Sequence, residues 1–234
     1  MRISRLRISP GNVCAALQTD GSYDELPISA TMFWVHATPA TDLAVPYPDA
    51  PGRTELIDCT AAFRELPQDL KRRLEGLRAW HEDGHGIVDI ENMGQLTEVE
   101  FYPGRTHEPG VLHELVRTHP HTGEKSLWCP LDTLRSVEGM SEEEALELLV
   151  PLKDHLLQPR FRYSHQHQPH DVMVWDTLQT LHKANPIGTA TSAETTRFLY
   201  RISVKGDPSA TLPREDDPAW LEHYIHKNAG KERA

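Results

Sequence analysis

The chain has 234 residues, of which 38% are hydrophobic and 25% are charged, so it is long enough for one domain with a substantial core and is typical of globular proteins. Its formal net charge of −11 disfavours nucleic-acid binding, because phosphate backbones select basic surfaces. No apolar run approaches the ~20 residues of a membrane span, so we expect no membrane partner.

The N-terminal half combines short strands with one helical stretch. Alternation of apolar residues predicts a strand in residues 2–9, and β-branched and aromatic residues predict a buried strand in residues 28–38. Residues 54–59, TELIDC, predict a further short strand. Apolar residues at helical spacing predict two short helices in residues 59–82, separated by Pro67.

The C-terminal half is dominated by strands. We expect a long functional or mobile loop at residues 83–110 and a helix at 141–158, which Ser141 and the acidic residues after it would cap. The remaining expected elements are strands around a turn at 111–130, two strands around a His/Pro turn at 160–176, a strand at 197–207 and a short helix at 217–234.

The order of these elements predicts the fold class. Strands, a helical insertion and more strands favour a mainly β protein with flanking helices, built as an antiparallel barrel or jelly roll. We expect one domain over residues 1–234. Cys14, Cys59 and Cys129 are far apart and form no CxxC pair, which is typical of a reducing compartment. With no secretory signal in the basic N-terminal residues, we expect a cytoplasmic protein.

The segment WDTLQTLHKA (175–184) contains a lone histidine, His182, and RFLYR (197–201) follows with arginines four residues apart. At the open end of a jelly roll, two histidines and a carboxylate can hold a metal and leave positions for a cosubstrate and O2. A keto acid on that metal needs a cation for its far carboxylate, and arginine binds carboxylates with two parallel hydrogen bonds. His182 and Arg197 fit this arrangement, but a buried histidine and a structural salt bridge have the same spacing.

Five stretches carry a family resemblance in a specific order: residues 19–39, 51–77, 115–130, 168–184 and 197–207. Together they resemble the TauD/TfdA family of Fe(II)- and 2-oxoglutarate-dependent dioxygenases. The resemblance implies a double-stranded β-helix, or jelly roll, in which Asp20 and His182 bind Fe(II). It further implies that Thr54 and Arg197 hold 2-oxoglutarate, and that Arg201 lies in the catalytic site near the substrate or the other end of the cosubstrate.

The sequence departs from the family pattern at two places. The family's His-x-Asp motif is Gln18-Thr19-Asp20 here, so Gln18 or a water would complete the metal site, and an amide oxygen is a weaker iron ligand than imidazole. Family members also carry a longer segment before this motif. We therefore expect the barrel to lack outer strands, or the chain to be a shortened product.

Three other histidine features are alternatives for the metal site. His81-Glu82-Asp83 matches His-x-Asp literally, but its position favours a loop feature. His36 could replace the missing ligand, although a half-buried strand histidine is the simpler interpretation. SHQHQPH (164–170) suggests zinc, since His165 and His167 would share one strand face, but no cysteine or carboxylate stands at finger-like spacing and we interpret it as a turn.

The resemblance implies an oxygenase that uses Fe(II), 2-oxoglutarate and O2 to hydroxylate a small organic substrate, and Arg201 suggests an anionic one. Gln18 supports the alternative of a catalytically impaired homologue that binds a small carboxylate through Arg197. A third alternative is an interaction protein that forms a homo-oligomer through an unpaired strand edge.

Overall fold

The computed structural model describes residues 2–6, 17–39, 51–82, 110–129, 133–185, 191–192 and 194–205, with only the backbone described for 2–6 and 205. The strands are β1 (Arg2–Leu6), β2 (Ile28–Ala37), β3 (Thr54–Asp58), β4 (Arg78–His81), β5 (Val111–Glu114), β6 (Val116–Thr118), β7 (Lys125–Leu127), β8 (Leu134–Val137), β9 (Arg162–His165), β10 (Val172–Asp176), β11 (Thr180–Ala184) and β12 (Phe198–Lys205). The helices are α2 (Cys59–Arg64), α3 (Gln68–Leu74), α4 (Glu142–Leu156) and the 3-10 helix η1 (Pro159–Phe161).

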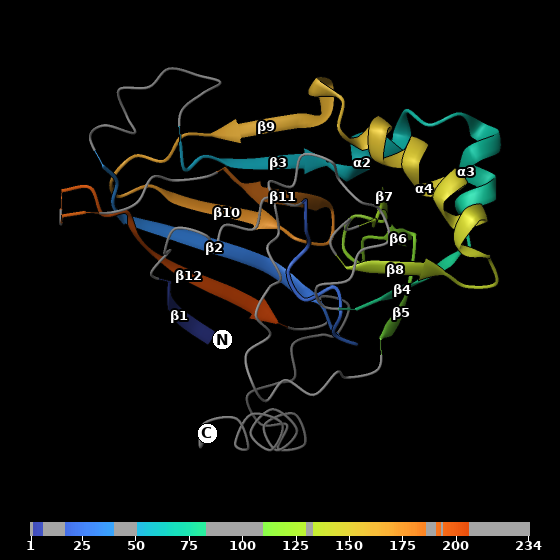
Figure 1. The fold of residues 1–234 in the computed structure, drawn as a ribbon, viewed down its shortest axis with the longest axis horizontal. Helices are drawn as coiled ribbons and strands as arrows, with labels where there is room; N and C mark the ends of the chain where they lie inside the picture. Colours follow the sequence, from blue (N-terminus) through green and yellow to red (C-terminus); the bar gives the residue numbers. More distant parts are fainter. Residues whose placement is uncertain are drawn as a thin grey trace, which may run out of the picture.

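Two antiparallel sheets form the part of the fold that holds the candidate site. One has the strand order β1-β12-β2-β10 and the other has the order β11-β3-β9. Their strands run roughly in line in Figure 1, with helices α2, α3 and α4 gathered beyond one end. Strand β10 ends next to the turn that leads into β11, so the chain passes directly from the first sheet to the second. This arrangement agrees with the predicted mainly β jelly roll with flanking helices.

Alternation along the strands decides which side chains face the interior. On β2, Thr31 and Val35 are fully buried, whereas Trp34 and His36 are exposed on the opposite face. Trp175 on β10 lies with its ring centroid 5.1 Å from that of His182 on β11, so side chains of the two sheets meet between them. This interior is rich in polar groups.

The apolar core lies mainly beside this polar interior, where the helices cover the sheets. Helix α4 begins at a capping box, because the Ser141 side chain accepts from the N–H of Glu144 while the Glu144 carboxylate accepts from the N–H of Ser141. The helix buries one apolar face consisting of Ala145, Leu148, Leu149, Leu152 and Leu156. These side chains join one cluster with residues of α2, β3, β8 and β11, which anchors β3 and β11 from outside the site.

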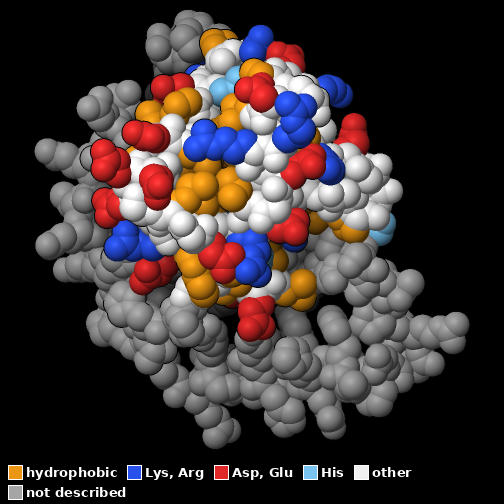
Figure 2. Space-filling model, turned by 90° about the vertical axis from the view of Figure 1, so that its right-hand side faces the viewer, with side chains coloured by type: hydrophobic (Ala, Val, Ile, Leu, Met, Phe, Trp, Pro, Cys, Tyr) orange, Lys and Arg blue, Asp and Glu red, His pale blue; other side chains and the backbone are white. Residues whose placement is uncertain are grey.

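The helical end of the molecule has a mixed surface. Figure 2 shows Lys and Arg side chains interspersed with Asp and Glu around small hydrophobic patches on this side. Ion pairs among the described residues include Arg78–Glu138, Lys125–Glu75 and Arg160–Glu65. None of the helices among the described residues combines the length and apolar character that a bilayer crossing requires.

The structure corrects one expectation about the elements. The second predicted helix ends at Leu74, and Gly76 adopts φ 80°, a left-handed conformation that terminates helices and favours glycine. The chain after it forms β4 and pairs with β5 and β8, so cross-strand pairing overrides the helical pattern up to residue 82. The two strands predicted around a turn at 160–176 are confirmed as β9 and β10, which belong to different sheets. The helix expected at 217–234 and nearly all of the loop expected at 83–110 lie outside the described residues.

Candidate active site

Residues 17–20 lie along strand β11 and are attached to it by the backbone. The N–H groups of Gln18 and His182 each donate to the carbonyl oxygen of the other at 2.9 Å, and the Thr19 hydroxyl donates to the carbonyl of Thr180 at 3.0 Å. Directly opposite residues of an antiparallel pair place their side chains on the same face. Gln18 and His182 therefore meet, and the side-chain amide nitrogen of Gln18 lies 3.5 Å from Nε2 of His182.

Asp20 reaches the same point from the turn that precedes β2. Its Oδ1 atom lies 3.8 Å from Nε2 of His182 and also contacts the guanidinium of Arg201 on β12. Its Oδ2 atom accepts a hydrogen bond from the Thr31 hydroxyl at 2.8 Å. The predicted residues Gln18, Asp20, His182 and Arg201 thus lie in one cluster, hereafter the Asp20–His182 centre, in which Asp20 and His182 are buried and Gln18 and Arg201 half-buried.

The electrostatics of this centre favour an ionised carboxylate and a neutral imidazole. Burial alone would raise the pKa of Asp20, but the neighbouring His182 and Arg201, with the hydrogen bond from Thr31, lower it below its ordinary value. Burial lowers the pKa of His182, and although Asp20 opposes this shift, Arg201 adds to it. Deprotonated imidazole and carboxylate are the forms that bind metals.

The donor set of this centre fits a divalent metal ion with two strong ligands and one weak one. His182 offers an imidazole nitrogen, Asp20 a carboxylate oxygen and Gln18 an amide oxygen once its amide group is turned. A metal ion on Asp20 must share or displace the guanidinium of Arg201, which already contacts the same carboxylate oxygen. The centre therefore contains a cation of its own beside the proposed ligands.

A second cluster, hereafter the Thr54–His167 cluster, contains the other two predicted residues. The hydroxyl of Thr54, at the start of β3, lies 2.8 Å from Nε2 of His167. Arg197 is 8% exposed and donates to the carbonyl oxygen of Gly52. Burial lowers the pKa of His167 to about 3, and the charge of Arg197 is the next largest cause. His167 thus contacts Thr54 and is within electrostatic range of Arg197.

The two clusters share the interior but are separate. Arg201 lies on β12, and Arg197 directly precedes that strand four residues earlier, a separation of up to ~13 Å along an extended chain. Across the sheet, aromatic rings fill the space between the two histidines. The ring of Phe33 lies 6.3 Å from that of His167 and 4.8 Å from that of Trp175, which in turn lies 5.1 Å from that of His182.

The alternative histidines lie elsewhere. His36 faces outward from β2, where its ring contacts Trp34 and Phe198, so it does not reach the Asp20–His182 centre. His81 is not a loop residue: it ends β4, is fully buried and contacts the rings of His113 and Trp128. Asp83 is outside the described residues.

His167 is a candidate site residue that the family motifs do not identify. It lies in the predicted turn after β9, and the pairing of β9 with β3 brings its imidazole to Thr54. The available signal was the alternation of His165 and His167, which places neighbouring imidazoles on one side of the chain.

Two antiparallel sheets that enclose a buried carboxylate–imidazole pair define the class of the protein as a jelly roll with a candidate metal centre. A family model described as "Taurine catabolism dioxygenase TauD, TfdA family" matches residues 7–203. The chain therefore belongs to the TauD/TfdA family, as its motifs indicated.

Curated relatives match about three quarters of the chain. The (S)-phenoxypropionate/alpha-ketoglutarate-dioxygenase of Sphingobium herbicidovorans is 30% identical over 182 residues, which cover 77% of this chain and 62% of the relative. The alpha-ketoglutarate-dependent 2,4-dichlorophenoxyacetate dioxygenase of Burkholderia sp. (strain RASC) is 32% identical over 179 residues, covering 76% and 56%. The chain thus spans about three fifths of the length of these relatives.

Solved structures show the same fold. The crystal structure of AAD-2 in complex with Mn(II) and N-oxalylglycine aligns with a TM-score of 0.67 and 27% identity, covering 87% of this chain and 72% of that one. A protein from Burkholderia xenovorans described as a taurine dioxygenase aligns with a TM-score of 0.64 and 24% identity, covering 88% and 62%.

Proposed function

We propose that the chain is an Fe(II)- and 2-oxoglutarate-dependent oxygenase that hydroxylates a small organic substrate. In this reaction 2-oxoglutarate, O2 and a substrate C–H group become succinate, CO2 and a C–OH group. Membership of the TauD/TfdA family and the names of its dioxygenase relatives support the proposal. The single observation that carries it is the convergence of Asp20 and His182, from distant parts of the chain, to 3.8 Å in a buried site.

In this proposal Asp20 and His182 hold the iron, and Gln18 or a water takes the third protein-side position. When bound, Fe(II) supplies the activation of O2 that protein side chains cannot provide. The protein contributes the rest. The Thr31 hydroxyl fixes the orientation of the Asp20 carboxylate, the backbone pair fixes Gln18 against His182, and burial excludes water.

We assign the cosubstrate to the Thr54–His167 cluster. Arg197 would hold the far carboxylate of 2-oxoglutarate, and Thr54 would donate a hydrogen bond to it. The burial of both residues supports this role, because a charge-assisted hydrogen bond is stronger away from water. Arg201 would face the primary substrate, and two relatives named for phenoxy-carboxylate substrates support an anionic compound.

The direct test is anaerobic titration with Fe(II) and 2-oxoglutarate, followed by an assay for succinate with candidate carboxylates. We expect a weak visible charge-transfer band from the iron–2-oxoglutarate complex, and succinate and CO2 in equal amounts once O2 is admitted. A protein that binds 2-oxoglutarate without the band and without succinate would contradict the oxygenase proposal.

A second candidate is a small-carboxylate-binding protein without oxygenase activity. It is favoured by Gln18 in place of a strong ligand and by the contact of Arg201 with Asp20, which already balances the buried carboxylate. Binding of 2-oxoglutarate that is indifferent to added Fe(II) would support this candidate, whereas binding that tightens with Fe(II) would support the oxygenase.

We further propose that residues 1–234 act as one domain in the cytoplasm. The buried cysteines Cys59 and Cys129 support this location, because both are free thiols. Size-exclusion chromatography with light scattering would establish whether the chain forms a homo-oligomer.

A further inference from the structure

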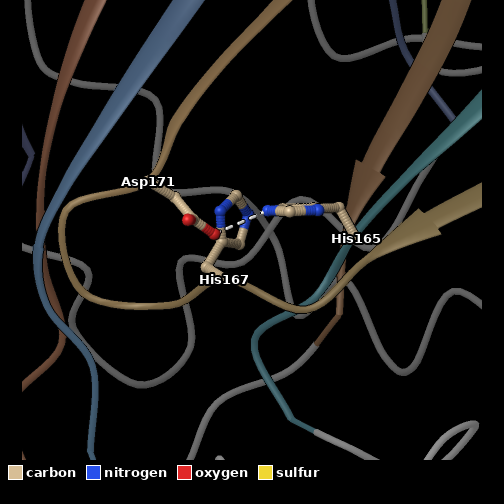
Figure 3. A group of neighbouring side chains, drawn as sticks. All are labelled: His165, His167 and Asp171. Atoms are coloured by element: carbon tan, nitrogen blue, oxygen red, sulfur yellow. Dashed lines mark hydrogen bonds and ion pairs between the residues drawn. The ribbon is translucent and has the colours of Figure 1, made fainter.

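The turn between β9 and β10 gathers three metal-ligating side chains outside the Asp20–His182 centre. One nitrogen each of His165 and His167 and a carboxylate oxygen of Asp171 all lie within 4.8 Å of one another. Figure 3 shows the ring of His167 beside the line that joins His165 to Asp171. We propose that His165, His167 and Asp171 form a second metal site, which binds a divalent transition-metal ion of the zinc type.

The turn fixes the carboxylate. The N–H of Asp171 donates to the carbonyl of Gln168 at 3.1 Å, and His170, at φ 75°, provides the left-handed residue of this tight turn. The Oδ2 atom of Asp171 accepts from the N–H of Gln168 at 2.8 Å and lies 2.9 Å from Nε2 of His165. The carboxylate is thus directed toward His165 before any ion binds.

His167 provides the independent observation that points to a ligand. Its side chain is 2% exposed, and its Nδ1 atom is buried without a hydrogen-bond partner among the described residues. Its Nε2 atom pairs with the Thr54 hydroxyl at 2.8 Å. When Nε2–H donates to Thr54, Nδ1 presents its lone pair, as in metal-binding histidines whose other ring nitrogen donates a hydrogen bond. A metal ion would satisfy the otherwise unpaired nitrogen.

Geometry and access are compatible with an ion. Zinc ligands at ~2.0–2.1 Å from the metal lie ~3.3 Å from each other in a tetrahedral site, close to the 2.9 Å between His165 and Asp171. These two side chains are 27% and 30% exposed, so they can adjust toward His167 and admit an ion from solvent. Two imidazoles and one carboxylate leave a fourth position for water.

Metal binding by His165, His167 and Asp171 depends on the charges around them. The positive charge of Arg197 acts on His167 and opposes a second cation, so the Asp171 carboxylate is needed to offset it. The N–H of Gln168, at 2.8 Å, and the His165 ring, at 2.9 Å, both contact this carboxylate and favour its ionised form. The Phe33 and Trp175 rings separate this cluster from His182, so one ion cannot serve both places.

The test is titration of the metal-stripped full chain with Zn²⁺ alone, by calorimetry at neutral pH, in an Asp20→Asn background that weakens the other centre. We expect about one equivalent of Zn²⁺ to bind. His165→Gln and Asp171→Asn should each weaken this binding at least about tenfold, as loss of one ligand does. The matched control is His170→Asn, an exposed histidine of the same turn whose replacement tolerates the left-handed conformation.

Three results would overturn the proposal: no Zn²⁺ binding in the Asp20→Asn background, binding that is unchanged by both His165→Gln and Asp171→Asn, or an equal loss in His170→Asn. Because His165 and Asp171 are partly exposed, these variants should keep their fold, which circular dichroism checks. The proposal does not rest on the oxygenase function, although His167 belongs to both the metal site and the Thr54–His167 cluster. If the chain forms succinate but binds no zinc at His165, His167 and Asp171, the second metal site is refuted and the oxygenase function is not.

Discussion

His182 and His167 are both buried, and burial lowers the pKa of both, yet their surroundings differ. His182 faces the Asp20 carboxylate at 3.8 Å and the Gln18 amide at 3.5 Å. His167 faces a hydroxyl, that of Thr54, at 2.8 Å. Two rings with the same protonation state are therefore placed beside different groups.

The difference shows that burial and ligand function are separate properties. Burial makes each imidazole neutral and able to donate a lone pair, whereas the neighbours decide what it can bind. The carboxylate beside His182 completes the proposed metal ligand pair of the Asp20–His182 centre. The hydroxyl on His167 instead fixes its tautomer, joins it to the proposed cosubstrate position and leaves its other nitrogen for the proposed second metal site. The predictions below test each half of this comparison.

The largest expected effect separates the two arginines. Arg197→Ala should weaken 2-oxoglutarate binding about 100-fold, or ~3 kcal/mol, because it removes the cation proposed for the far carboxylate. Arg201→Ala should leave that affinity within about threefold and instead impair turnover with an anionic substrate. Calorimetric titration with 2-oxoglutarate measures the first effect, and equal losses in both variants would defeat this division of roles.

The second prediction tests the effect of burial on the pKa of a histidine, His81, that belongs to neither cluster. Burial, with smaller effects of His113 and Arg117, lowers the pKa of His81 from 6.5 to about 3. Between these values the unfolded chain binds a proton that the folded chain does not, so stability falls as the pH falls. From pH 7 to pH 5 this histidine alone should cost ~2 kcal/mol of unfolding free energy.

Urea unfolding at the two pH values measures this cost. His81→Phe should lose ~2 kcal/mol less than the wild type between pH 7 and pH 5, whereas the control His170→Asn, at an exposed position, should lose as much as the wild type. Identical pH dependence in the wild type and His81→Phe would show that His81 is protonated without unfolding.

The third prediction strengthens the Asp20–His182 centre. Gln18→His should tighten Fe(II) binding at least about tenfold, or ~1.4 kcal/mol, because imidazole replaces an amide next to His182. Gln18→Asn is the matched control, since it keeps an amide and shortens its reach. Unchanged Fe(II) affinity in Gln18→His would mean that position 18 does not face the metal.

The smallest expected effect concerns the hydroxyl that contacts His167. Thr54→Val should weaken 2-oxoglutarate binding about fivefold, or ~1 kcal/mol, which is the usual contribution of one neutral hydrogen bond. Thr54→Ser should restore most of the affinity because it restores the hydroxyl. If Thr54→Ser binds as weakly as Thr54→Val, the methyl group rather than the hydroxyl matters.

The fold was largely predictable because its signals are local. The strand of residues 28–38, the helix after Ser141 and the break at Pro67 follow from alternation, capping and backbone chemistry. The strand at Arg78–His81 was not predictable, because four residues after a helical pattern become a strand only when β5 and β8 pair with them. Pairing with strands that are distant in the sequence also places β9 and β10 in different sheets.

The candidate site was predictable only for the residues that belong to the family motifs. The family motifs predict that Gln18, Asp20 and His182 lie close together, and in the structure the three side chains are neighbours. The contact of Arg201 with Asp20 could not be predicted from the spacing of residues in the sequence, because it depends on the register of β12 against β2. The contact of His167 with Thr54 likewise depends on the register of β9 against β3.

The backbone pair between Gln18 and His182 makes the two positions mechanically dependent on each other. Each amide proton is held by the other residue's carbonyl, so the segment that carries Asp20 cannot leave β11 without releasing both. Deuterium uptake at these two amides should therefore occur in a single opening event. Their exchange rate measures, without any ligand, how often the Asp20–His182 centre opens.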